Sequence, residues 1–253
     1  MAASNALAEI QHVLAELPLL TWSGKSSDPK CVIAQAMLNA YIRESFKEWG
    51  WHKEYIIKNA NKYRHFLDFY KSFAQGEGAP PLRVGIEVEF GYHARIDTDI
   101  RKFQTAFQKN TIDVGVIVCL TEVDAGLAGR GVACFEALVE NLADFTESTI
   151  TCPILAIGLS RQNTCIVDLS LSHYPCYKAL TGKTSVKEKR RTVHALKRGV
   201  PVAKLGPKQQ SAPVNVVLHA DAALHVTQHT LPPLALTMSP AFFSHMPCED
   251  VEC

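Results

Sequence analysis

The chain has 253 residues, 47% of them hydrophobic and 20% charged, a composition that predicts a globular protein with a buried core. Its formal net charge of +1 excludes an overall attraction to polyanions, so a nucleic-acid surface would need local clusters of basic residues. The eight cysteines form no Cys-x-x-Cys pair, and their scatter fits reduced thiols better than a disulfide framework. The sequence shows no signal-peptide pattern and no membrane-length apolar run, so we expect a cytoplasmic protein without a membrane partner.

Two amphipathic helices are expected at the start of the chain. Ser4 and Asn5 can cap a first helix that runs to Leu17. Asp28 and Pro29 form a favourable N-cap and first-turn pair for a second helix, whose apolar stripe continues towards residue 49. We interpret both helices as packing scaffold.

Residues 50–73 interleave aromatic and basic side chains. Such a segment can stack on nucleic-acid bases or hold phosphates, but it can equally be a helix surface on which lysine and arginine stems cover apolar groups. Asp68 lies between Leu67 and Phe69, and these apolar flanks indicate a strand. The sequence AQGEGAPP that follows reads as a turn, so we expect Asp68 on the first strand of a hairpin.

The second strand of this hairpin is predicted at Leu82–Phe90, which reads LRVGIEVEF. Strict alternation of apolar and other residues places Glu87 and Glu89 side by side on one face. Like charges at this spacing repel each other unless a cation or a shared proton relieves them, which favours a divalent metal site. The alternative is an amphipathic strand with a solvated acidic face.

The segment that follows alternates between helical and strand patterns. Residues 95–109 carry apolar residues at helical spacing, and 112–120 is the nearly continuous apolar run of a strand buried on both faces. A glycine-rich loop, another amphipathic helix and a buried strand at 152–159 come next. This order predicts an α/β core over roughly residues 80–160.

The character of the chain changes after about residue 160. Residues 183–198 concentrate lysine and arginine with a single acidic residue, and the last fifty or so residues are rich in proline with little periodicity. We therefore expect two parts, a core at 1–160 that includes the N-terminal helices and a divergent part at 161–253. The second part would contain the basic segment and an irregular, proline-containing tail.

No small-molecule cofactor is expected. The sequence TGKT at 181–184 lacks the first glycine of a phosphate-binding loop, and AGLAGRG lacks the glycine order of a dinucleotide fingerprint.

The arrangement of Asp68, a turn and Glu87-Val88-Glu89 resembles the active site of PD-(D/E)xK nucleases. Its context resembles the BglII/BstYI group of Type II restriction endonucleases, relatives of BamHI, over roughly residues 9–160. The matching sequences are Glu87-Val88-Glu89-Phe90, Ile112-Asp113-Val114-Gly115, and Gly129-Arg130-Gly131 before Phe135-Glu136. The resemblance implies an α/β restriction-endonuclease-like core with a central mixed sheet flanked by helices.

The same resemblance implies a metal-dependent phosphodiesterase. Asp68, Glu87 and the carbonyl of Val88 would hold Mg²⁺, for which Mn²⁺ can substitute, because these ligands are all oxygen. Glu89 would orient or deprotonate the attacking water, and the products would carry 5′-phosphate ends. The position of Glu89 holds no lysine, so transition-state charge would depend more on the metal. Glu77, in the turn, remains an alternative to Asp68 as the first acidic ligand.

The implied partner is double-stranded DNA, cut at a short palindromic site, GATC-centred by the nearest resemblance, within a restriction-modification system. A palindrome requires two active sites and therefore a homodimer. Tyr92 and His93 are candidates to reach base edges. Arg101 and Lys102 could contact phosphate or the dimer mate, or form an ordinary solvated helix face. Further phosphate-contact candidates, with a charged tail as the alternative, are Lys189, Arg190, Arg191, Lys197 and Arg198.

Three other functions remain open from the sequence alone. A nuclease of the same fold could act in repair or on DNA structure, which would give no discrete fragments. A non-catalytic DNA-binding module would keep its binding when Glu87 is replaced. An unrelated α/β enzyme could use the glutamate pair for other acid–base work.

Overall fold

The computed structural model describes residues 2–23, 32–57, 65–146, 150–162, 164–181, 186–207 and 236–238. The chain forms two compact units. The first unit comprises Met1–Leu17, Tyr41–Ser160 and Leu234–Cys253, and the second comprises Pro18–Ala40 and Arg161–Pro233.

The first unit is built on a six-stranded mixed sheet with the order β3-β4-β5-β6-β7-β9. The central strands β5, β6 and β7 run parallel, whereas β3, β4 and β9 pair antiparallel with their neighbours. The strands are β3 (His52–Ile57), β4 (His65–Phe73), β5 (Leu82–Val88), β6 (Val114–Leu120), β7 (Ile154–Leu159) and β9 (Leu236–Met238).

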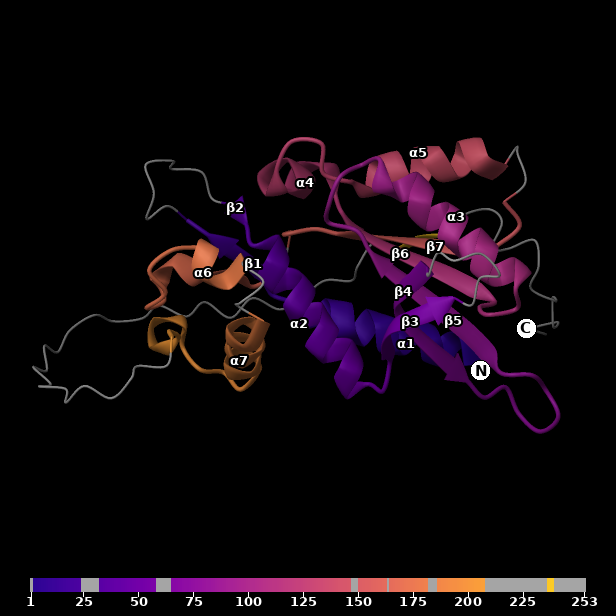
Figure 1. Cartoon of the computed structure of the whole chain (residues 1–253), viewed down its shortest axis with the longest axis horizontal. Helices are drawn as coiled ribbons and strands as arrows, with labels where there is room; N and C mark the ends of the chain where they lie inside the picture. The colour runs from indigo at the N-terminus through magenta and orange to yellow at the C-terminus, as the bar shows by residue number, and fades with distance from the viewer. Residues whose placement is uncertain are drawn as a thin grey trace, which may run out of the picture. The chain divides into compact units, whose positions relative to one another are not determined.

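Helices cover both faces of this sheet. Figure 1 shows α3 (Arg95–Gln108) and α5 (Phe135–Thr146) on one side of the strands and α1 (Ala2–Ala15) on the other. The short helix α4 (Glu122–Ala128) follows β6, and α2 (Gln35–Glu48) contains the boundary between the two units. The predicted α/β core, a central mixed sheet flanked by helices, is therefore confirmed.

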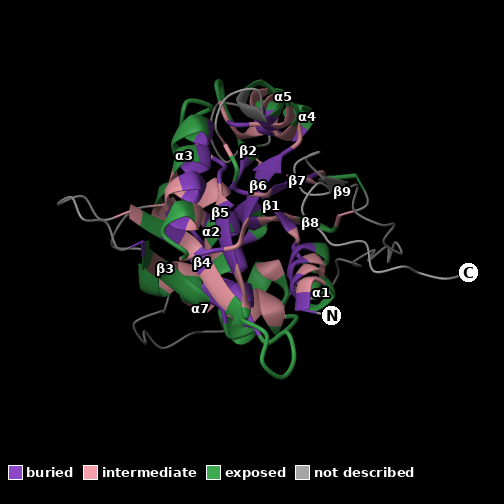
Figure 2. Ribbon diagram, turned by 90° about the vertical axis from the view of Figure 1, so that its right-hand side faces the viewer, coloured by how far each residue is buried: buried purple, intermediate pink, exposed green. Residues whose placement is uncertain are grey.

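A buried hydrophobic cluster lies between the sheet and the helices α3 and α5. Ile100 and Phe103 of α3 are fully buried in this cluster, together with Ile117 and Cys119 of β6. Figure 2 shows buried residues following the central strands, while the helices expose their outer faces. This packing fixes α3 against β6, and it thereby fixes the polar side chains that α3 carries at its margin.

The β4–β5 hairpin is the element that brings acidic residues together. Phe69 pairs with Ile86 across the hairpin, so the same register places Asp68 opposite Glu87. The turn between the strands contains Gly76 and Gly78, whose φ angles of +121° and +79° favour glycine. The predicted hairpin and the strand assignment of Asp68 are confirmed.

Other predicted elements agree in part. The helix predicted at 95–109 is α3, and the predicted strands at 112–120 and 152–159 are β6 and β7. The helix interpretation of residues 50–73 is wrong, because they form β3 and β4, in which aromatic and β-branched residues pair across strands. The start predicted for the second helix at Asp28 lies outside the described residues, and α2 begins at Gln35.

The second unit contains a small three-stranded sheet with the order β2-β1-β8. Its strands are β1 (Leu19–Trp22), β2 (Val32–Ile33) and β8 (Ile166–Asp168), and its helical elements are η1 (Leu169–Leu171), α6 (Lys178–Thr181), α7 (Val186–Lys197) and η3 (Val202–Lys204). Helix α7 contains most of the basic segment and is a regular amphipathic helix. Most of the proline-containing tail lies outside the described residues. No helix in the described part is long and apolar enough to cross a membrane.

Candidate active site

The glutamate pair lies where β5 ends, and both side chains are buried. Glu87 is only 4% exposed and Glu89 only 6% exposed. The backbone N–H of Glu89 donates to the carbonyl of Val118 at 2.9 Å, which extends the parallel pairing with β6 by one residue. The interpretation of this strand as carrying a solvated acidic face is therefore wrong.

Asp68 reaches the same place from the neighbouring strand. Its Oδ2 atom accepts a hydrogen bond from the backbone N–H of Val88 at 2.9 Å. Glu77 is exposed in the turn at the opposite end of the hairpin, one strand length away from Glu87. The structure thus brings Asp68, and not Glu77, beside the glutamate pair.

Helix α3 adds two groups that sequence reasoning did not assign to this site. The Nζ atom of Lys102 lies 2.8 Å from Oε1 of Glu87 and 2.8 Å from Oδ1 of Asp99. Asp99 is 5% exposed, and the Lys102 side chain is 16% exposed. The predicted basic face of α3 is consequently divided, because Arg101 is exposed while the ammonium of Lys102 lies among carboxyl groups.

A sequence signal for these groups exists in the helical spacing. Arg95, Asp99 and Lys102 follow one another at intervals of four and three residues, so they share one stripe of α3. This stripe borders the apolar one that packs on the sheet. The signal was missed because nothing in the sequence alone tells which margin of a helix faces the end of a neighbouring strand.

The concentration of carboxyl groups perturbs their ionisation. Burial raises the pKa of Glu87 to about 9, and the nearby charge of Asp68 adds to this increase. Burial likewise raises the pKa of Glu89 to about 7, although the N–H of Gly91, 2.5 Å from its Oε1, favours the charged form. Burial also raises the pKa of Asp68. When they are ionised, these carboxyl groups carry more negative charge than their protein partners neutralise.

The charge of Lys102 is set by the same cluster. Burial alone would lower the pKa of Lys102, but the carboxylates of Glu87 and Asp99 raise it above its ordinary value. Lys102 therefore stays cationic inside the site. The Arg95 guanidinium is more distant, at 4.0 Å from Oε2 of Glu89, and its side chain is largely exposed.

The donor set fits a hard divalent cation, although the carboxylates are engaged with protein groups. Among the residues that the structure describes, no three acidic, histidine or cysteine side chains converge as a ready-made metal cage. Oδ2 of Asp99 is buried and accepts no hydrogen bond within that part of the chain, and Oε1 of Glu87 has no partner there besides the Lys102 ammonium. Oxygen acceptors of this kind suit Mg²⁺ or Mn²⁺.

The loop after β5 is tied to the loop before α5. The N–H of His93 donates to the carbonyl of Gly131 at 2.8 Å, and the N–H of Ala133 donates to the carbonyl of Gly91 at 2.7 Å. Tyr92 is 73% exposed and His93 is also exposed. The two candidate base-contacting residues therefore project from a backbone that is held in place just beyond the glutamate pair.

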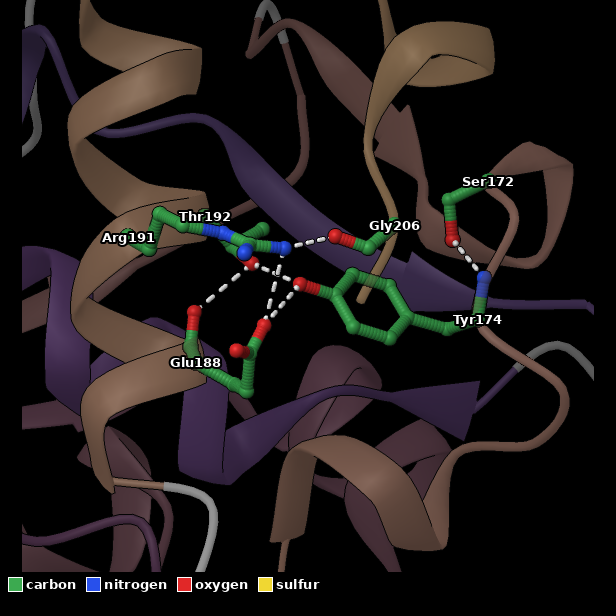
Figure 3. Close-up of polar contacts among 6 residues, drawn as sticks. All are labelled: Ser172, Tyr174, Glu188, Arg191, Thr192 and Gly206. Atoms are coloured by element: carbon green, nitrogen blue, oxygen red, sulfur yellow. Dashed lines mark hydrogen bonds and ion pairs between the residues drawn. The ribbon is translucent and has the colours of Figure 1, made fainter. Parts of the chain in front are cut away.

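The candidate phosphate contacts of the basic segment lie on α7 and just after it. Arg190 and Arg198 are exposed, whereas Lys189 and Lys197 are half-buried. Arg191 differs from the others in its contacts, which Figure 3 shows. Its guanidinium lies 3.0 Å from Oε2 of Glu188 and also donates to the carbonyl of Gly206.

The same cluster contains the buried Tyr174. Its hydroxyl group donates to Oε2 of Glu188 at 3.0 Å and lies 2.8 Å from the hydroxyl of Thr192 (Figure 3). Glu188, Arg191 and Thr192 thus tie α7 to the segment that carries Tyr174. The charge of Arg191 is committed to this structural network.

Comparison with known proteins identifies the family. A model of the restriction endonuclease BglII/BglIII family matches residues 1–159, more than half of the chain. The crystal structure of restriction endonuclease BglII complexed with a DNA 16-mer matches with a TM-score of 0.53 and 16% identity, covering 62% of this chain and 71% of that chain. This likeness shows the fold, and no curated protein sequence matches. The chain belongs to the BglII/BglIII family of Type II restriction endonucleases.

Proposed function

We propose that the chain cuts both strands of DNA at a short palindromic site, GATC-centred, in a reaction that depends on Mg²⁺. The observation that carries the metal dependence is the burial of Glu87, Glu89 and Asp99 beside the half-buried Asp68, with the Lys102 ammonium in contact with Glu87 and Asp99. Buried carboxylates in such excess require a further cation or protons. A divalent ion supplies that charge, and all the available donors are oxygen.

Each residue of the cluster has a distinct role in this proposal. Asp68, Glu87 and the carbonyl of Val88 would hold Mg²⁺, with Mn²⁺ as a substitute, and the bound ion would supply charge neutralisation at the scissile phosphate. Glu89 orients the attacking water and accepts its proton, because the Gly91 N–H holds Oε1 and fixes the direction of the carboxylate.

The bond changes follow from in-line displacement at phosphorus. The water oxygen forms the new bond to phosphorus and the bond to the 3′ oxygen breaks, so the product carries a 5′-phosphate. The departing 3′ oxygen takes a proton from solvent. The exposed residues Tyr92, His93 and Arg101 serve as DNA contacts, as do the exposed Arg190 and Arg198 of the α7 segment.

The proposed partners are double-stranded DNA and a second copy of the chain. The matched solved structure is a complex of BglII with DNA, which supports DNA as the substrate. A palindrome presents two symmetry-related phosphates, and a two-fold homodimer places one site at each. A neighbouring DNA methyltransferase would complete a restriction-modification system.

The experiment is digestion of plasmid and phage DNA with Mg²⁺, Mn²⁺, Ca²⁺ or EDTA, followed by mapping of the ends. Discrete fragments with 5′-phosphates are expected with Mg²⁺ or Mn²⁺ alone. Glu87→Gln should lower the single-turnover rate about a thousandfold, because several kcal/mol of transition-state stabilisation corresponds to that factor. Glu77→Gln is the matched control, since this glutamate is exposed in the hairpin turn.

Other results would redirect the proposal. A smear in place of bands would indicate a nuclease that recognises DNA structure. Binding without cleavage in every metal, unchanged by Glu87→Gln, would indicate a DNA-binding module whose carboxyl groups have another role.

A further inference from the structure

Among the described residues of the cluster described above, the Lys102 ammonium lies closest to the carboxylates, whereas the Arg95 guanidinium is 4.0 Å from Glu89. Lys102 comes from α3, not from the strand that supplies the glutamate pair, and it bridges Glu87 and Asp99 at 2.8 Å each. The position that carries a lysine in an acid-x-lysine unit is occupied here by Glu89. The positive charge therefore enters the site from a different element.

The surroundings of this ammonium are unusual for a structural ion pair. Surface pairs between residues three apart on a helix are exposed and contribute little to stability. Lys102 and both of its carboxylate partners are instead withdrawn from solvent. Among the described residues, Oε1 of Glu87 has no partner besides this ammonium, and the buried Oδ2 of Asp99 accepts no hydrogen bond, so the carboxylate oxygens outnumber the donors that reach them.

We propose that Lys102 is a positioning residue that occupies the divalent-ion position in the free protein, and that Asp99 keeps it in the site when the ion enters. This inference rests on the proposed function, in which Glu87 is a metal ligand. In the free protein the ammonium contacts Oε1 of Glu87 and holds this side chain at the end of β5. When the ion binds Glu87, the ammonium remains paired with Asp99 and does not move out into solvent.

The exchange has a direct consequence for metal affinity. A divalent ion must compete with the ammonium for Glu87, so Lys102 weakens metal binding while it keeps the empty site ordered. Removal of the ammonium should strengthen metal binding, although it removes a favourable contact from the free protein. A purely structural ion pair predicts lower stability with no change in metal affinity.

The test is calorimetric titration of the DNA-free full-length protein with Ca²⁺, which requires no cleavage. Lys102→Met should bind Ca²⁺ roughly tenfold more tightly than the wild type, since a positive charge beside the ion is lost. Lys102→Arg, which retains the charge, should stay within about threefold of the wild type. Lys109→Met, at the exposed end of α3, is the control and should leave the affinity unchanged.

Asp99→Asn provides a second arm. This change leaves Lys102 with Glu87 as its only carboxylate partner and removes one negative charge, so Ca²⁺ binding should weaken. Lys102→Gln, measured in parallel, keeps the experiment decisive where the methionine variant does not fold. Thermal unfolding in EDTA verifies that each variant is folded before titration.

The outcomes separate this inference from the proposed function. Equal Ca²⁺ affinity in the wild type, Lys102→Met and Lys102→Gln, together with Mg²⁺-dependent cleavage by the wild type, overturns the role of Lys102 alone. Weaker Ca²⁺ binding in both variants overturns it as well, because Lys102 would then support metal binding. An absence of both Ca²⁺ binding and cleavage in the wild type overturns the metal site itself.

Discussion

Glu87 is a single residue whose burial links the chemistry of the site to the stability of the fold. The residue is 4% exposed, and its carboxyl group lies near the charge of Asp68. Burial and this like charge raise its pKa from the ordinary 4.5 to about 9. The folded protein without metal therefore binds a proton at Glu87 over a pH range in which the unfolded chain has released it.

The sign of the resulting pH dependence is fixed by linkage. Between about 4.5 and about 9 the folded state holds more protons than the unfolded state, so the free energy of unfolding falls as pH rises. We expect Glu87→Gln to become more stable relative to the wild type as pH rises through this range. Thermal unfolding of both proteins in EDTA at a series of pH values measures this difference in stability. A difference that is constant with pH would contradict the prediction.

Gly115 shows at the residue scale how closely α3 approaches the sheet. A Cβ atom added to Gly115 would lie 2.6 Å from the ring of Phe103, which is fully buried. Gly115→Ala should therefore destabilise the protein by about 1–3 kcal/mol through overpacking. Gly126→Ala, in α4, meets nothing within 4 Å and should be neutral or stabilising. Denaturant unfolding of the two variants gives the comparison, and equal stabilities would contradict it.

The elements differ in how well the sequence predicts them. Strand β5 and helices α3 and α5 follow from hydrophobic periodicity, whereas β6 and β7 follow from continuous apolar runs that are buried on both faces. Strand β3 does not follow, since its exposed edge carries charged and aromatic side chains without a clear period. Strand β1 is only four residues long, too short for periodicity to distinguish it from a loop.

The residues of the candidate site also differ in how well the sequence predicts them. Asp68, Glu87 and Glu89 are predictable because they interrupt apolar strands, and their proximity follows from one hairpin. Asp99 and Lys102 are not, because their contact with Glu87 depends on how α3 packs against β6. Residues that a tertiary contact brings together leave only a weak signal in the local sequence.

An ion pair between Arg83 of β5 and Asp113, just before β6, should make the stability of the protein depend on pH in acid. Asp113 accepts hydrogen bonds from the Arg83 backbone N–H at 2.7 Å and from the Arg83 guanidinium at 2.7 and 3.0 Å. Burial alone would raise the pKa of Asp113, but these bonds lower it below its ordinary 3.8. The folded state therefore favours the ionised form, and the resulting stability is present above pH 3.8.

This stability should be lost as pH falls through the lowered pKa of Asp113. Asp113→Asn should cost about 1 kcal/mol at neutral pH, a small value because the pair is partly exposed and screened by solvent. The cost should vanish in strong acid, where the wild-type carboxyl group is also neutral. Urea unfolding of both proteins at neutral and acidic pH measures the difference. A cost that grows towards low pH would contradict this account.

At the scale of the whole molecule, the proposed dimer has a kinetic signature. Two sites on one palindrome cut both strands within a single binding event, so supercoiled plasmid should become linear with little nicked intermediate. A mixture of the wild type with an excess of Glu87→Gln should instead accumulate nicked circles, because mixed dimers carry one competent site. Gel analysis of a time course gives both results, and a monomer acting alone would nick first in both reactions.

The near-neutral net charge leaves the basic residues of the α7 segment as the main candidates for the electrostatic part of DNA binding. Exposed Arg190 and Arg198 differ from Arg191, whose guanidinium contacts Glu188 and the carbonyl of Gly206. Each phosphate contact that is lost lowers the slope of log affinity against log salt by about one. Arg190→Gln combined with Arg198→Gln should therefore lower this slope by up to about two, measured in Ca²⁺ to prevent cleavage. Arg191→Gln should lower the unfolding temperature and leave the slope unchanged. A slope that falls only for Arg191→Gln would contradict this prediction, because Arg191 would then be the residue that contacts phosphate.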